Sequence, residues 1–164
     1  MTSEDKKKTF WNIVFSIFFL VIFFVLLRIL FVYNGELPTQ VPFFDLALMV
    51  LATFRLTRLF VYDKITFFIR DALYHVKEEY TEEGVTYFLK KERVEGPMLT
   101  AYELLTCPWC FSMWAATFVA FFYFLTPLAW LPICIFAISG VASFVQIFTN
   151  MIGWASENGK IKAT

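Results

Sequence analysis

The sequence predicts an all-α membrane protein with four transmembrane helices, and three observations lead to this fold class. Hydrophobic residues make up 59% of the 164 residues and charged residues only 17%, whereas a soluble domain carries about 25% charged residues. Several apolar runs approach the roughly 20 residues that a helix needs to cross a bilayer. Lysine and arginine gather in alternate loops, as in multi-pass proteins. We therefore expect the lipid bilayer to surround most of the chain.

Four apolar runs are the predicted spans. They cover residues 10–33, 43–62, 108–125 and 128–151, and a short turn around Pro127 joins the last two into a helical hairpin. No small-residue cleavage site follows the first run, so we expect a retained anchor instead of a signal peptide. The predicted organisation is an anchor helix with its outer loop (1–42), a membrane domain (43–155) with a cytoplasmic insert (64–106), and a cytoplasmic tail (156–164).

Positive charge predicts the orientation, because lysine and arginine in short loops stay on the cytoplasmic side. Lys6 to Lys8, residues 64–93 and the C-terminal lysines fall on one side, whereas residues 34–42 and the turn at Pro127 contain no lysine or arginine. We therefore expect an inner-membrane protein with both termini in the cytoplasm. The formal net charge is zero, so no nucleic-acid partner is expected.

The cytoplasmic insert is predicted to contain one amphipathic helix. From Lys64 to Val76, apolar residues recur every three or four positions, which is typical of a helix with one apolar face. Its place directly after a span favours a helix lying in the membrane interface, and packing beneath the other helices is the alternative. Residues 78–95 are rich in charge and contain the turn signal Glu83-Gly84. They predict a small β-hairpin, with a charged loop as the alternative.

Two arginines lie inside the second predicted span. Arg55 and Arg58 are three residues apart, so they share a helix face. A charge in hydrocarbon is costly unless it is paired or reaches water, and such residues usually face the interior of a helix bundle. Arg58 is close enough to the end of the span to reach the lipid headgroups. Arg55 lies deeper and needs a partner, for which Glu103 and a lipid phosphate are the candidates.

The run Thr106-Cys107-Pro108-Trp109-Cys110 predicts a helix start, with Thr106 as the N-cap and Pro108 in the first turn. Both thiols then lie near the positive end of the helix dipole, which lowers thiol pKa values. Three interpretations stay open: simple packing, half of a zinc site that His75 and Glu103 would extend, and a redox dithiol. Cys134 is expected near the opposite membrane surface and cannot join Cys107 and Cys110 in one site.

Motifs of common enzymes are absent from the sequence. It contains no glycine-rich phosphate loop, no Gly-x-Ser-x-Gly and no His-Glu-x-x-His. We therefore do not expect an enzyme, with thiol redox activity as the exception. Ser139, Gly140 and Ser143 in the fourth span have a spacing that permits close helix contact, within the chain or in a homo-oligomer.

Two blocks of the sequence resemble a known family. They run from Leu51 to Ile65 and from Glu103 to Trp114, and they are similar to the bacterial membrane family called domain of unknown function 1360. The resemblance covers Phe44 to about Ser143. It implies a small membrane protein of firmicutes, actinomycetes or their phages, without an established biochemical activity, and some members are named as sporulation proteins. The motif residues that it implies here are Arg55, Arg58, Asp63, Cys107, Pro108, Trp109, Cys110 and Trp114.

The leading functional hypothesis is a membrane protein without enzymatic activity whose cytoplasmic face is a structural or partner-binding centre. It rests on the expected location of the motif residues and Glu103 in one layer at that face. The partner would be another membrane protein or a second copy. The alternatives are a phage holin-like or pore-forming protein, suggested by small size and several spans, and a membrane thiol oxidoreductase or zinc-stabilised protein, suggested by the cysteine pair.

Overall fold

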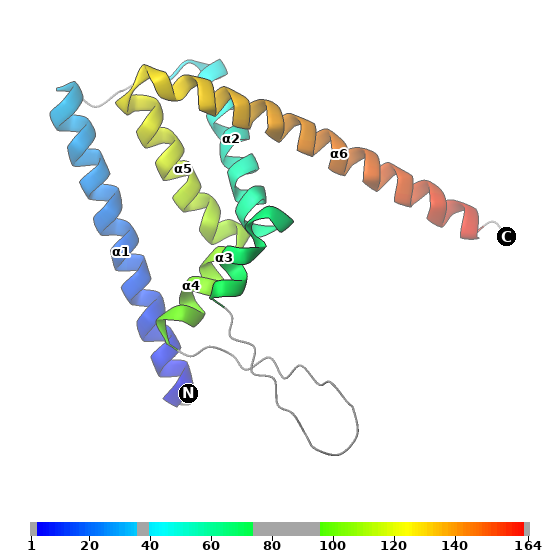
Figure 1. The fold of residues 1–164 in the computed structure, drawn as a ribbon, viewed down its shortest axis with the longest axis horizontal. Helices are drawn as coiled ribbons and strands as arrows, with labels where there is room; N and C mark the ends of the chain where they lie inside the picture. Colours follow the sequence, from blue (N-terminus) through cyan, green and yellow to red (C-terminus); the bar gives the residue numbers. More distant parts are fainter. Residues whose placement is uncertain (1–2, 36–39, 74–95, 163–164) are drawn as a thin grey trace. The chain divides into compact units, whose positions relative to one another are not determined.

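The computed structural model describes residues 3–35, 40–73 and 96–162, and every regular element in these residues is a helix (Figure 1). The α-helices are α1 (Ser3–Asn34), α2 (Phe43–Val61), α3 (Phe67–Ala72), α4 (Pro97–Thr106), α5 (Pro108–Leu125) and α6 (Trp130–Lys162), and the 3-10 helices are η1 (Lys64–Thr66) and η2 (Pro127–Ala129). The predicted all-α class is confirmed for the described residues. His75 and the predicted β-hairpin lie outside them.

Among the residues that the structure describes, three helical segments are long and apolar enough to cross a membrane: Lys6–Asn34, Pro108–Leu125 and Pro127–Ser156. They correspond to the first, third and fourth predicted spans. The second predicted span forms one helix, α2, which is 19 residues long but contains an aspartate and two arginines. Its charge content sets it apart from the other three.

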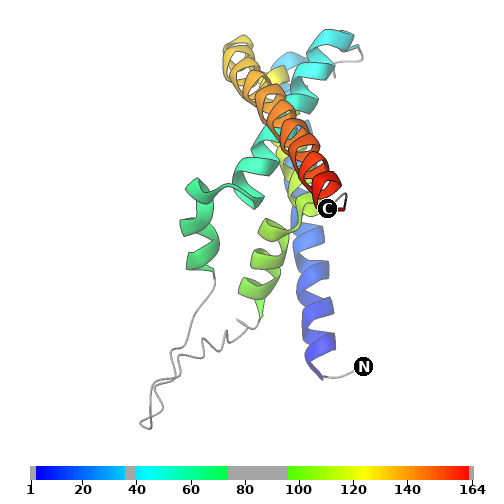
Figure 2. The same cartoon turned by 90° about the vertical axis from the view of Figure 1, so that its right-hand side faces the viewer.

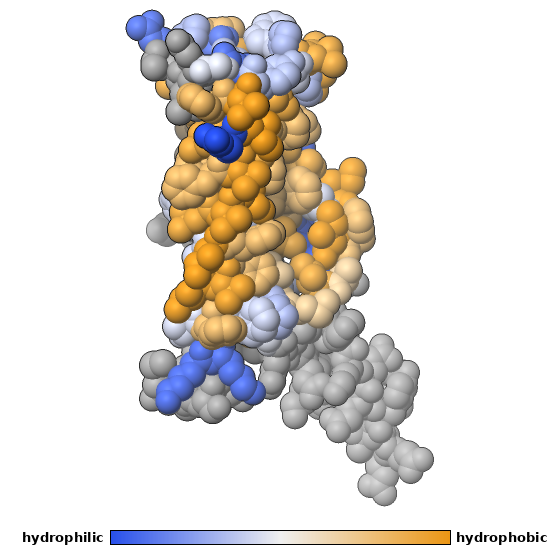
Figure 3. Space-filling model, turned by 90° about the vertical axis from the view of Figure 1, so that its left-hand side faces the viewer, coloured by the Kyte–Doolittle hydropathy of each residue, from blue (hydrophilic) through white to orange (hydrophobic). Residues whose placement is uncertain are grey.

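Helix α1 has little protein around it. Among its described residues, Leu30 is the one buried apolar side chain. Figure 3 views the molecule from the side on which α1 lies in Figure 1. It shows a band of hydrophobic side chains there, bounded by hydrophilic residues. An apolar helix surface that no protein covers is what lipid covers in a membrane protein. The helix ends at Gly35, whose φ of +77° and N–H bond to the Phe31 carbonyl at 3.0 Å form a left-handed C-cap.

The turn predicted around Pro127 is confirmed. Pro127 is the first residue of η2, and Thr126 is its N-cap. The Thr126 hydroxyl accepts a hydrogen bond from the Leu128 N–H at 3.3 Å. Proline is favoured at a first helical position because its missing N–H would have no partner there. This short element links α5 to α6.

The predicted amphipathic helix begins as a 3-10 turn. η1 and α3 together cover its first nine residues, Leu73 follows as a turn, and Tyr74 to Val76 lie outside the described residues. Ile65 and Phe68 are exposed, whereas Thr66 is buried. The segment therefore turns a polar side chain inward and leaves large apolar side chains on its surface.

The chain divides into two compact units that share three helices. Unit 1 comprises residues 1–28 and 57–114, and unit 2 comprises residues 29–56 and 115–164. In unit 1, α4 lies beside the N-terminal part of α1, as both ribbon views show (Figures 1 and 2). The core of unit 2 is a cluster of Met49, Ala52, Val119, Ala129 and Ile133.

Helices α2 and α6 come very close together within unit 2. A Cβ atom added to Gly140 would lie 2.6 Å from the backbone carbonyl oxygen of Leu51, which is closer than real Cβ contacts. Ala52 and Ala137 are both almost fully buried. Small residues that let two backbones approach are the usual basis of helix packing in membranes. The predicted packing role of Gly140 is therefore confirmed, with α2 as its neighbour.

Candidate functional site

Two side chains bind the carbonyl groups at the C-terminal end of α2. Arg70 Nη2 donates to the Asp63 carbonyl at 2.7 Å and Nη1 donates to the Phe60 carbonyl. The Thr66 hydroxyl donates to the Leu59 carbonyl at 2.5 Å. The last carbonyls of a helix have no partner within it. Arg70 and Thr66 therefore satisfy these groups and attach η1 and α3 to the end of α2.

The cysteine pair lies where α4 ends and α5 begins. Cys107 stands between the two helices with φ −90° and ψ 109°, and its carbonyl accepts the Phe111 N–H at 2.9 Å. The Cys107 sulfur also accepts the Cys110 N–H at 3.3 Å. This is the pattern of an N-cap residue, in which the side chain satisfies a free N–H of the first turn. Cys107 thus caps α5.

The predicted N-cap role of Thr106 is wrong. Thr106 is the last residue of α4, and its hydroxyl donates back to the Tyr102 carbonyl at 2.8 Å. A threonine inside a helix often bonds the carbonyl four residues before it. Because α4 extends to Thr106, the free N–H groups of α5 are left to Cys107.

The surroundings of Cys107 favour its ionisation. The sulfurs of Cys107 and Cys110 are 2.8 Å apart, and both cysteines are free. Hydrogen bonds from the Cys110 thiol, and then from the Cys110 and Trp109 N–H groups, hold the pKa of Cys107 below its ordinary value. A thiolate gains more from such donors than a thiol does. These hydrogen bonds therefore favour the thiolate form of Cys107.

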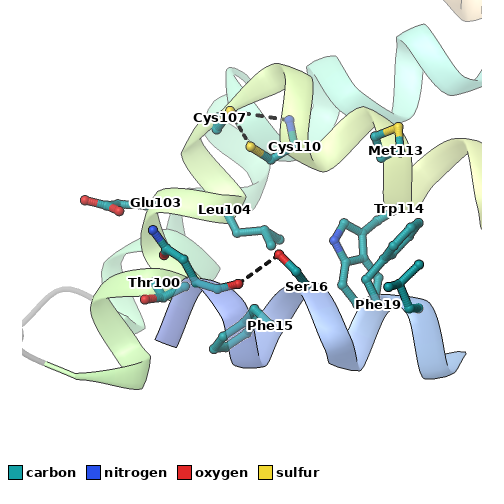
Figure 4. Close-up of a pocket in the computed structure, with 12 residues that line it drawn as sticks. Phe15, Ser16, Phe19, Thr100, Glu103, Leu104, Cys107, Cys110, Met113 and Trp114 are labelled. Carbon is teal, nitrogen blue, oxygen red and sulfur yellow. Dashed lines mark hydrogen bonds between the residues drawn. The ribbon is translucent and has the colours of Figure 1, made fainter. Parts of the chain in front are cut away.

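A cleft of about 670 Å³ lies between α1 and the bend from α4 to α5 (Figure 4). Both cysteines line it, together with the polar side chains of Asn12, Ser16, Thr100 and Glu103. Its apolar wall consists of Phe15, Phe19, Leu20, Leu104, Met113 and Trp114. The Trp114 ring packs edge-on against Phe19, with centroids 4.8 Å apart. The cleft therefore combines aromatic surface with thiols and hydrogen-bonding groups.

Thr100 has a buried hydroxyl without a partner. Its side chain is 5% exposed, and among the described residues its Oγ1 is the one buried side-chain polar atom that makes no hydrogen bond. Such a group costs about 1–3 kcal/mol. A ligand or water that hydrogen-bonds to Thr100 in the cleft wall would remove that cost.

Glu103 forms an ion pair with α1. Lys8 Nζ lies 2.6 Å from Glu103 Oε1, and the two side chains are 46% and 41% exposed. An exposed pair of this kind contributes only about 0–1 kcal/mol. The main effect of the pair is on the local charge, because Lys8 compensates the Glu103 carboxylate on the rim of the cysteine cleft.

The remaining motif residues occupy different places. Arg58 lies at the end of α2 in unit 1, with its guanidinium 6.0 Å from the Tyr62 ring. Trp109 is 83% exposed. Arg55 belongs to unit 2, where its Nε donates to the Ser139 hydroxyl at 2.8 Å. Within unit 1 the cleft brings together Glu103, Cys107, Cys110 and Trp114.

A zinc site is not complete in the described part of the chain. No group of three His, Cys, Asp or Glu side chains is placed there to hold a metal ion. The cysteine pair supplies two of the four ligands that a structural zinc site needs. The proposed additional ligand His75 lies outside the described residues. These residues therefore do not fit zinc by themselves.

Sequence reasoning overlooks three contributors to the site: helix α4, helix α1 and Arg70. Gly96 with φ +80° and Pro97 at the first position of α4 form a helix-start signal that could have revealed α4. No such signal exists for α1, because an apolar span does not indicate which neighbour it contacts.

The sequence matches a protein family and is similar to individual proteins of Bacillus subtilis. A family described as "Protein of unknown function (DUF1360)" matches residues 48–149. "Sporulation protein YjcA" of Bacillus subtilis (strain 168) is 34% identical over 118 residues, which cover 68% of this chain and 94% of the relative. "UPF0713 protein YngL" of the same organism is 30% identical over 108 residues, covering 65% and 79%. No solved structure matches. The family match includes the cysteine pair and omits the α1 wall of the cleft.

Proposed function

The chain belongs to the DUF1360 family, and from this premise we propose a four-span membrane protein whose cysteine cleft binds a segment of another membrane protein. The observation that carries the proposal is the cleft. It gathers two thiols, an unpartnered threonine hydroxyl and aromatic side chains in one concave surface. Concave apolar surfaces with a few polar groups are the usual ligand-binding sites on proteins.

The contacts of the charged side chains in α2 support this helix as the fourth span. Asp45 accepts the Tyr123 hydroxyl at 2.5 Å, Arg55 bonds Ser139, and Arg58 lies one turn from the helix end near Tyr62. A charged side chain within a span is tolerated when it is paired or reaches the interface. At 1.5 Å per residue, 19 residues in α2 give about 28 Å, close to the thickness of the bilayer core.

The cleft belongs on the cytoplasmic side in this proposal. Lys8 at the start of α1 pairs with Glu103 on the rim, and Lys6 and Lys7 precede it. Lysines next to a span are retained in the cytoplasm. The partner would therefore reach the cleft from the inner surface of the membrane or from the inner leaflet.

We extend to this chain the sporulation role that the name of one relative states. In a Bacillus subtilis strain without YjcA, this chain should restore the count of heat-resistant spores. The double variant Cys107→Ala/Cys110→Ala should leave the count near that of the strain without YjcA, because the substitutions remove both sulfurs from the cleft.

Cys134→Ala is the matched control. Cys134 is a free cysteine of unit 2 and does not line the cleft, so this variant should restore spores like the unaltered chain. Immunoblots of membranes would show equal protein levels. Unchanged folding, assembly and spore counts in the double variant would refute the proposed role of the cleft.

A further inference from the structure

The geometry of the cysteine pair suits reversible disulfide formation. Cys107 is the N-cap of α5 and Cys110 is the third residue of its first turn, with 2.8 Å between the sulfurs. Cys110 is exposed and Cys107 is partly exposed. In Figure 4 the two sulfurs point toward each other, and both cysteines belong to the lining of the cleft. The pair can therefore close a bond with little movement and can also meet another molecule.

The environment gives the two cysteines different roles. Cys107 accepts a backbone N–H at the start of α5, where the helix dipole favours negative charge. A proline occupies the first position of the helix, so the N–H groups of the second and third positions are the available donors. Cys107 is thus suited to act as the attacking thiolate, and the neighbouring Cys110 is suited to resolve the intermediate.

We infer that Cys107 and Cys110 form a redox-active dithiol that exchanges with low-molecular-weight disulfides entering the cleft. The inference rests on the proposed function, because it assigns a chemistry to the same cleft. No other cofactor is required, since the oxidant is the disulfide itself.

The exchange balances in two steps. The Cys107 thiolate attacks one sulfur of the disulfide R–S–S–R, forms a mixed disulfide and releases one RS⁻. Cys110 then gives up its proton, which RS⁻ takes, and its sulfur attacks the Cys107 sulfur. The bond between Cys107 and R breaks, a Cys107–Cys110 disulfide forms, and a second RS⁻ leaves. Two protein thiols are oxidised and one disulfide is reduced to two thiols.

The cleft walls favour binding of a small disulfide. Its volume of about 670 Å³ is within the range of small-molecule sites. Trp114 and Phe19 offer aromatic surface, and Asn12 and Ser16 add polar side chains to the lining. Lys8 compensates Glu103, so the carboxylate at the rim repels an approaching anion less.

Oxidised glutathione is the probe for a test on the full chain, reduced and purified in detergent. A Cys134→Ser background removes the remaining thiol. In that background the protein should lose both thiols and gain no stable adduct, because the intramolecular disulfide displaces glutathione. Cys110→Ser should trap one glutathione per chain on Cys107. Cys107→Ser should form its adduct more slowly, because the N-cap position, where a backbone N–H and the helix dipole favour a thiolate, then holds a serine.

Thiols that stay free in the background protein, or equal adduct rates in the two serine variants, would overturn the inference. The background protein keeps every residue that lines the cleft, so an altered cleft lining cannot explain its result. If exchange fails while the double alanine variant still does not restore the spore count, partner binding stands without redox chemistry. If exchange occurs while that variant makes normal spores, the dithiol is active and the proposed function fails.

Discussion

Single residues have more than one task in this protein, and Cys107 is the clearest case. It satisfies the first turn of α5 as an N-cap and at the same time supplies a sulfur to the cleft. Serine, threonine or aspartate usually occupies such a position. A cysteine there performs the cap, and hydrogen bonds from the Cys110 thiol and then from the N–H donors lower its pKa.

The acidity of Cys107 leads to a prediction about pH. Alkylation by iodoacetamide requires the thiolate, so its rate rises with pH through the pKa. The lowered pKa of Cys107 should place the midpoint of its rate profile below that of a free cysteine. Cys110→Ala removes the largest cause of the shift and should move the midpoint to higher pH, as read by mass spectrometry of the Cys107 peptide.

Cys134→Ala serves as the control and should leave the Cys107 midpoint unchanged. A midpoint at or above that of free cysteine in the unaltered chain would contradict the hydrogen-bonding account of its acidity.

At the scale of helices, contacts depend on where small and polar residues meet. Gly140 allows α6 to approach the Leu51 carbonyl, and one residue earlier Ser139 bonds Arg55. The close approach of α2 and α6 and the hydrogen bond to a charged side chain thus occur at the same crossing. Arg70 works similarly in unit 1, where it closes the end of α2.

The crossing predicts a difference between two glycines of α6. Gly140→Ala should destabilise the protein by about 1–3 kcal/mol, because the new methyl group meets a backbone atom that cannot rotate away. Gly153→Ala is the matched control, since a Cβ there has nothing within 4 Å, and alanine should be neutral or slightly stabilising in a helix. Equal unfolding transitions of the two variants in detergent would refute the tight crossing.

At the scale of the whole molecule, the number of spans decides the topology. In the described part of the chain three helical segments qualify as spans by length and apolarity, and α2 is our proposed fourth. Four spans place both termini on one side of the membrane, whereas three place them on opposite sides. The location of the C-terminus therefore tests whether α2 crosses.

Reporter fusions would measure this. Alkaline phosphatase fused after Gly35 or Thr126 should be active, because that enzyme folds only outside the cytoplasm. Green fluorescent protein fused after Leu73 or at the C-terminus should fluoresce, because it matures only inside. Fluorescence after Leu73 together with phosphatase activity after Gly35 supports α2 as a span. A C-terminal fusion with phosphatase activity and no fluorescence would exclude four spans.

The all-α class, the three apolar helices, the turn at Pro127 and the family follow from the sequence alone. The length of an apolar run and the position of a helix-breaking residue such as Pro127 are local properties of the sequence. In a bilayer, a long apolar segment forms a helix because its backbone polar groups must bond within the segment. The cysteine pair is likewise visible as a helix start, although its capping residue is not, because only the structure shows that α4 continues to Thr106.

Only the tertiary structure decided which side chains meet. Arg55 and Ser139 are 84 residues apart in the chain, and Asp45 and Tyr123 are 78 apart. The cleft likewise combines α1 with α4 and α5. In lipid, apolar surface does not drive one helix toward another, so partners are selected by close packing and polar contacts between distant segments. These contacts leave no periodic pattern in the sequence, and they determine the surroundings of Arg55 and of the two thiols.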